Sequence, residues 1–277
     1  MKKVNFVGYK QELLKAGIQE EEIYDFTGDP IESFYQRYFD WCIDNIKDYS
    51  KLFGVEPAYF YFWNTNIINA RAGKGRNIYR IRFSKPYMEV LYEKLGRKGL
   101  FFDKTDWVAF HNLQKITPNS LEFLMFQSST IFTFYHEFAH LVQFKDKTFS
   151  MSEYPSNEGF SFEKHVFEYD ADLNGSQFVS IYIQQFFDEQ VPEQYQTQNN
   201  YKRLMYLGIS SIIITQLLFL YGKVYPYPPV NLDVTFYKRQ HSHPHTYVRA
   251  KYIIERYVRI AKANGVQIDF GDTISNV

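Results

Sequence analysis

The stretch TIFTFYHEFAHLVQF, residues 130–144, constrains the fold more than any other part of the chain. It places His136 and His140 four residues apart in an apolar, aromatic run, with Glu137 directly after the first histidine. On a helix, side chains at this spacing share a face, so both imidazoles can reach one metal ion. Glu137 is rotated away from that face and can serve as general base toward a water at the ion. The stretch therefore predicts a helix that carries a metal site.

An alternative interpretation is a pair of core histidines followed by a surface glutamate. We favour the metal site because Glu137 lies within the apolar run, where an unpaired carboxylate is costly. A catalytic zinc ion takes three protein ligands and keeps one position open. A third histidine six residues after His140 would complete one known pattern, but that position holds Asp146. Asp146 is therefore only an alternative third ligand.

A better candidate for the third ligand lies in HVFEYDADLNGSQFV, residues 165–179. Glu168 and Asp172 are four residues apart on a second predicted helix, so they share a face. Glu168 can bind the ion, while Asp172 accepts a hydrogen bond from a ligand histidine and fixes the orientation of its ring. A solvated acidic face is the alternative, because Glu163 and Asp170 lie nearby.

HEFAH followed by EYDAD resembles the gluzincins, zinc peptidases with an HExxH motif and a distal ExxxD motif. The pattern looks like their ImmA/IrrE-type and HtpX-like members, and the chain is generally like the Lit-type phage-exclusion peptidases. The resemblance implies one zinc ion per chain, bound by His136, His140 and Glu168. It also implies that Glu137 is the general base and that Asp172 orients a ligand.

The sequence HSHPHTYVRAKYII, residues 241–254, is similar to the His-Pro…Arg element near the C-terminus of HtpX-like peptidases. This resemblance implies that His243 or Arg249 stabilises a tetrahedral oxyanion. A surface turn that opens the last helix is the alternative. Three neighbours are rivals for the oxyanion role: His241, His245 and Tyr247.

These patterns lead to one expected activity and two alternatives. We expect a zinc-dependent endopeptidase that cleaves a specific protein or peptide substrate with Glu137 as general base. The alternatives are a non-catalytic interaction protein stabilised by zinc and a membrane-anchored HtpX-like protease. Residues 204–222 have membrane-span length and no charge. Serine, threonine and glutamine interrupt them, so we favour a buried core helix over a membrane span.

The composition of the chain limits which binding partners and which cellular compartment we expect. The chain has 31 basic and 31 acidic residues, so no global field attracts nucleic acid. The single cysteine, Cys42, lies on the apolar stripe of a predicted helix, which indicates a buried thiol and a reducing compartment. No apolar segment follows the lysines at the N-terminus. We therefore expect a cytoplasmic protein without a nucleic-acid partner.

The predicted elements give an α+β fold, with a small β-containing N-terminal region, residues 1–115, and a mainly helical zinc-peptidase region, residues 116–277. The first region opens with a helix from a capping box at Asp29 to Gly54. Two strands, AYFYFWNTNII and NIYRIRF, flank RAGKGRN as a hairpin tip. Together with DWVAFHNL, residues 106–113, they are candidates for an edge strand that aligns a substrate backbone.

The second region is expected to consist of the HExxH helix, a return helix with EYDAD and two further helices. Hydrophobic periodicity and stop signals place these four helices from about residue 128, over 162–188, over 204–222 and over 246–264.

Overall fold

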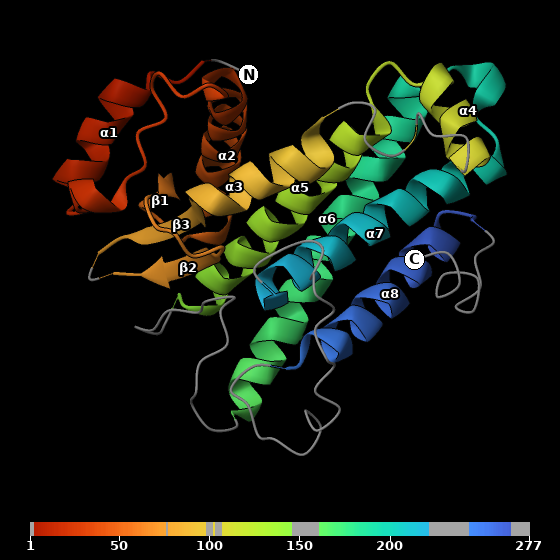
Figure 1. Ribbon diagram of the computed structural model, residues 1–277. Helices are drawn as coiled ribbons and strands as arrows, with labels where there is room; N and C mark the ends of the chain where they lie inside the picture. The colour runs from red at the N-terminus through yellow and green to blue at the C-terminus, as the bar shows by residue number, and fades with distance from the viewer. Residues whose placement is uncertain are drawn as a thin grey trace. The chain divides into compact units, whose positions relative to one another are not determined.

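The computed structural model describes residues 3–75, 77–97, 102, 107–145, 161–221 and 244–266. These residues form a small mixed sheet in the N-terminal part and a mainly helical remainder, which confirms the predicted α+β class (Figure 1). The chain packs into two compact units. The first comprises Met1–Glu89 and Glu137–Tyr154, and the second comprises Val90–His136 and Pro155–Val277. The division into residues 1–115 and 116–277 stays a prediction.

The first unit is built around a three-stranded sheet. Its elements are α1 (Phe6–Lys15), the 3-10 turn η1 (Glu20–Glu22), α2 (Glu32–Phe53), β1 (Ala58–Trp63), β2 (Ala70–Lys74) and β3 (Tyr79–Ser84). The strand order is β1-β3-β2, with β1 parallel and β2 antiparallel to β3. After the sheet, α3 (Lys85–Leu91) begins in the first unit and ends in the second, to which the π-helical η2 (Tyr92–Gly96) also belongs.

The predicted hairpin tip is wrong, because residues 70–74 form the strand β2. Ala70 and Ala72 are fully buried on one face of this strand, and Arg71 points to the other face. Alanine and glycine have low strand propensity, so the segment looks like a turn when it is judged by residue type. Its pairing with β3 shows instead that small side chains fit where the sheet meets its core.

Helix α2 covers one face of the sheet with aromatic side chains. The ring centroids of Tyr35 and Phe62 lie 4.9 Å apart, and Phe39 packs near both Phe60 and Phe62. The helix ends as predicted at Gly54, which adopts the left-handed conformation with φ 65°. Its start differs from the prediction, since Ile31 is the N-cap residue and makes no side-chain capping bond. Cys42 on α2 is buried, as predicted.

The second unit is helical. Its elements are α4 (Val108–Ile116), the first part of α5 (Leu121–Gln143), α6 (Phe162–Gln190), η4 (Glu193–Tyr195), α7 (Gln198–Tyr221) and α8 (Thr246–Ala263). Residues 106–113 were a candidate strand, and this prediction is wrong because residues 108–116 form α4. The short apolar run fits both periodicities, and Leu113 is buried on the helix. The helices α6 and α8 lie within two residues of their predicted bounds.

The helix with HExxH, α5, approaches the return helix α6 closely. A Cβ atom added to Gly175 would lie 2.8 Å from the carbonyl oxygen of Phe132. Only a residue without a side chain fits at this contact. The two helices lie side by side in Figure 1, with α7 and α8 on the further side of α6. This close approach brings the HExxH and ExxxD motifs together.

Among the described residues, α7 is the one helix with the length and apolar composition of a membrane span, and 67% of that window is buried inside the protein. Its hydroxyl side chains bond within the helix: Ser211 donates to the carbonyl of Leu207, and Thr215 donates to that of Ser211. Ser129 of α5 also donates to the carbonyl of Ser211. The burial of this window favours a core helix, and the choice between a core helix and a membrane span stays a prediction.

Candidate metal centre

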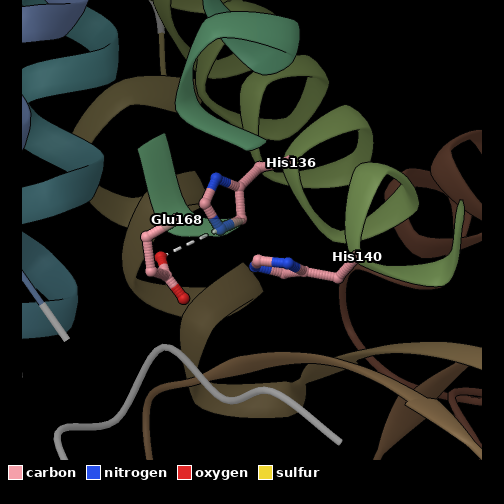
Figure 2. Close-up of side chains that lie close together, drawn as sticks. All are labelled: His136, His140 and Glu168. Carbon is pink, nitrogen blue, oxygen red and sulfur yellow. Dashed lines mark ion pairs between the residues drawn. The ribbon is translucent and has the colours of Figure 1, made fainter. Parts of the chain in front are cut away.

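Helices α5 and α6 bring together the three predicted ligands. His136 and His140 lie one turn apart on α5, and Glu168 projects from α6 toward them (Figure 2). One ligand atom from each of the three side chains lies within 4.8 Å of the other two. All three side chains are 1% exposed. The arrangement is that of a site able to hold a metal ion.

The donor set fits zinc in its chemistry, and one pair of ligands also has the spacing of a zinc site. Two imidazole nitrogens and one carboxylate oxygen are a ligand set of catalytic zinc sites. Ligands at about 2.1 Å from a tetrahedral ion lie about 3.4 Å from each other. The distance between His136 Nε2 and Glu168 Oε2 is 3.5 Å. This pair would therefore need little movement to bind one ion.

Asp172 lies next to the first ligand, His136, and Arg249 binds Asp172. The distance between Asp172 Oδ1 and His136 Nδ1 is 3.1 Å, as expected for a carboxylate that orients a ligand histidine. Arg249 on α8 donates from Nε to Asp172 Oδ2 at 2.9 Å and from Nη2 to Oδ1 at 2.8 Å. Its Nη2 also lies 3.2 Å from Glu168 Oε2. Arg249 therefore contacts both acidic residues of the ExxxD motif.

The second ligand has a partner of its own. His140 Nδ1 lies 2.7 Å from Oε1 of Gln143, one turn further along α5. With the proton on Nδ1 donated to this amide oxygen, Nε2 is the nitrogen available to a metal. The sequence interpretation missed this role of Gln143. The spacing of three residues on one helix is the signal that could have revealed it.

Glu137, the predicted general base, is 1% exposed and belongs to the first unit. Burial lowers the pKa of Arg71 on β2, the charges of Arg82 and Arg80 lower it further, and the carboxylate of Glu137 acts in the opposite direction. The next residue, Phe138, packs edge-on against Tyr49 and Phe53 of α2. These aromatic contacts fix the turn of α5 that carries Glu137.

The C-terminal candidates are only partly described. Arg249 lies at the centre as given above, whereas His241 and His243, like Asp146, lie outside the described residues. His245 is the N-cap of α8, where its Nδ1 accepts a hydrogen bond from the backbone nitrogen of Tyr247 at 3.2 Å. The oxyanion roles of His243 and Arg249 stay predictions.

Comparison with models of known protein families, with curated proteins and with solved structures finds no match for the chain.

Proposed function

We propose that the chain is a zinc-dependent endopeptidase of the gluzincin type, with His136, His140 and Glu168 as ligands of one zinc ion. The observation that supports this function is the buried His-His-Glu cluster, whose residues stand at the spacing of the HExxH and ExxxD motifs. When bound, zinc supplies Lewis-acid polarisation of a carbonyl group and makes a water more acidic.

The residues around the metal ion would then have separate roles in proton transfer and in orienting the ligands. Glu137 takes a proton from water and passes it to the leaving amine, which is the role of a general base that becomes a general acid. Asp172, whose Oδ1 lies 3.1 Å from His136 Nδ1, would orient the His136 ring, and the hydrogen bond with Gln143 would orient the His140 ring. Arg249 fixes the Asp172 carboxylate through two hydrogen bonds.

A second candidate function is a zinc-stabilised interaction protein without catalysis. The observation that favours it is burial, because the three ligand side chains and Glu137 are each 1% exposed. Structural zinc sites are closed, whereas catalytic sites keep a position for substrate.

The substitution Glu137→Gln separates the two functions. An endopeptidase would keep its zinc and lose about 100-fold or more of its turnover, the scale of general-base loss. The measurements are zinc content by mass spectrometry and cleavage products in the proteome of cells that express wild type or variant. Products common to both proteins, or loss of zinc in the variant, would favour the interaction protein. Glu163→Gln, an exposed position on α6, is the matched control.

A further inference from the structure

Each ligand histidine has a phenylalanine ring one helical turn away. Phe132 lies four residues before His136, and their ring centroids are 5.7 Å apart with the planes tilted by 37°. Phe144 lies four residues after His140, and their centroids are 5.9 Å apart with the planes nearly parallel. Phe132 and His136 belong to the second unit, whereas Phe144 and His140 belong to the first. Each ligand ring is thus packed by a buried aromatic neighbour from its own unit.

Phe132 also contacts the helix that carries the third ligand. A Cβ atom added to Gly175 on α6 would lie 2.8 Å from Cδ2 and 3.0 Å from Cε2 of the Phe132 ring. One edge of this ring therefore lies directly against the α6 backbone. Because protein interiors are close-packed, the ring cannot shift toward α6 unless the helix itself moves. Phe132 thus contacts both the ring of one ligand and the helix of another.

The His136 ring needs more than one contact to face a metal ion. The torsion that turns a histidine ring about its Cβ–Cγ bond has broad preferences, so the rotamer alone does not fix the ring plane. The Asp172 carboxylate, whose Oδ1 lies 3.1 Å from Nδ1, restrains that one atom. The packed Phe132 ring restricts the remaining tilt of the imidazole. Together the two neighbours would determine the direction in which Nε2 points.

We propose that Phe132 is a positioning residue of the metal centre, whose ring fixes the plane of the His136 imidazole so that Nε2 points to the place where the ion binds. This inference rests on the zinc site of the function proposed above. The contact with Gly175 makes the assignment specific, because it ties the same ring to α6, from which Glu168 projects (Figure 2). The effect of Phe132 on the ion runs through His136, and its role is to preset the ligand geometry.

The first test compares two buried phenylalanines of α5 in the full chain. Phe132→Leu removes the planar ring but keeps an apolar side chain, and Phe126→Leu does the same at a position further from the ligands. We expect Phe132→Leu to weaken zinc binding about 10-fold, the scale for a group that orients a ligand, and Phe126→Leu to leave zinc binding unchanged. Competition with a coloured chelator gives the dissociation constants. The visible spectrum of the cobalt-loaded protein, which reports ligand geometry, should change only in Phe132→Leu.

A pair of double-mutant cycles separates an effect on the His136 ring from a general loosening of the core. Phe132→Leu with Asp172→Asn acts twice on the same ring, so the combined loss of zinc affinity should differ about 3-fold or more from the product of the single losses. Phe132→Leu with Gln143→Leu acts on two different rings, and those losses should multiply. Should Phe132→Leu fail to fold, Phe132→Met removes the ring with a side chain that fills irregular space.

Three results would overturn the inference. They are zinc binding by the Phe132 variant as tight as that of wild type, an equal loss in Phe126→Leu, and the same coupling in both cycles. The proposed function fails by different results, namely absent zinc or unchanged products with Glu137→Gln.

Discussion

Arg249 on α8 donates hydrogen bonds to both carboxylate oxygens of Asp172 on α6, at 2.9 and 2.8 Å, although the two helices are far apart in the sequence. The same Oδ1 atom of Asp172 lies 3.1 Å from His136 Nδ1. One buried carboxylate thus links α8 to the first ligand of the metal centre.

Loss of the Arg249 side chain should destabilise the fold. Arg249→Ala leaves the buried charge of Asp172 uncompensated, which costs about 3–5 kcal/mol in the free energy of unfolding. Urea unfolding measures this loss, and Arg259→Ala, at an exposed position of the same helix, should stay within about 0.5 kcal/mol of wild type. A double-mutant cycle with Asp172→Ala should give a coupling energy of about 0.5–3 kcal/mol. Purely additive losses would contradict the link.

The ligand assignment predicts which substitutions remove the metal. His136→Ala, His140→Ala and Glu168→Ala each take away one of three ligands, so the purified variants should contain little zinc. Elemental analysis after dialysis against a weak chelator is the measurement. Glu163→Ala, at an exposed position five residues before Glu168 on α6, should keep about one zinc per chain. Full occupancy in all three ligand variants would rule out the site.

The contact between His140 and Gln143 predicts a graded effect on metal affinity. Gln143→Leu removes the acceptor at 2.7 Å and should weaken zinc binding about 10- to 100-fold, as expected for a group that orients a ligand. Gln143→Glu keeps an acceptor oxygen and should retain most of the affinity. Competition with a coloured zinc chelator gives the dissociation constants, and Gln11→Leu, exposed on α1, is the control. Equal affinities for the two Gln143 variants would show that this contact does not orient the ring.

Gly175 should not tolerate alanine, although alanine favours helices. The added methyl group would meet the Phe132 carbonyl oxygen at 2.8 Å and push α5 away from α6. We expect a loss of about 1–3 kcal/mol in the free energy of unfolding, the usual cost of overpacking, together with weaker zinc binding. Gly8→Ala on α1 meets Asn5 only at 3.5 Å and should instead stabilise by about 0.5–1 kcal/mol. Equal effects at the two glycines would show that the helix contact is loose.

The sequence was most informative where the pattern is local. Helix geometry alone predicts that His136 and His140 share a face and that the two acidic residues of the ExxxD motif share another. Helix stop signals likewise predict the end of α2 at Gly54. The sheet was harder, because β1 pairs in parallel with β3 and the strand between them in the sequence holds mostly small residues. The partner of Arg249 lies 77 residues away in the sequence. Helix periodicity carries no information about such a pairing.

A metal ion bound by residues of both α5 and α6 would also affect the stability of the protein. Because His140 lies on α5 and Glu168 on α6, one ion bound to both would cross-link the chain and close a loop of residues 141–167. Such a tie restricts the unfolded chain much as a disulfide does, but it opens again when the ion leaves. Removal of the ion would then lower the stability of the fold and take away the metal centre in a single step.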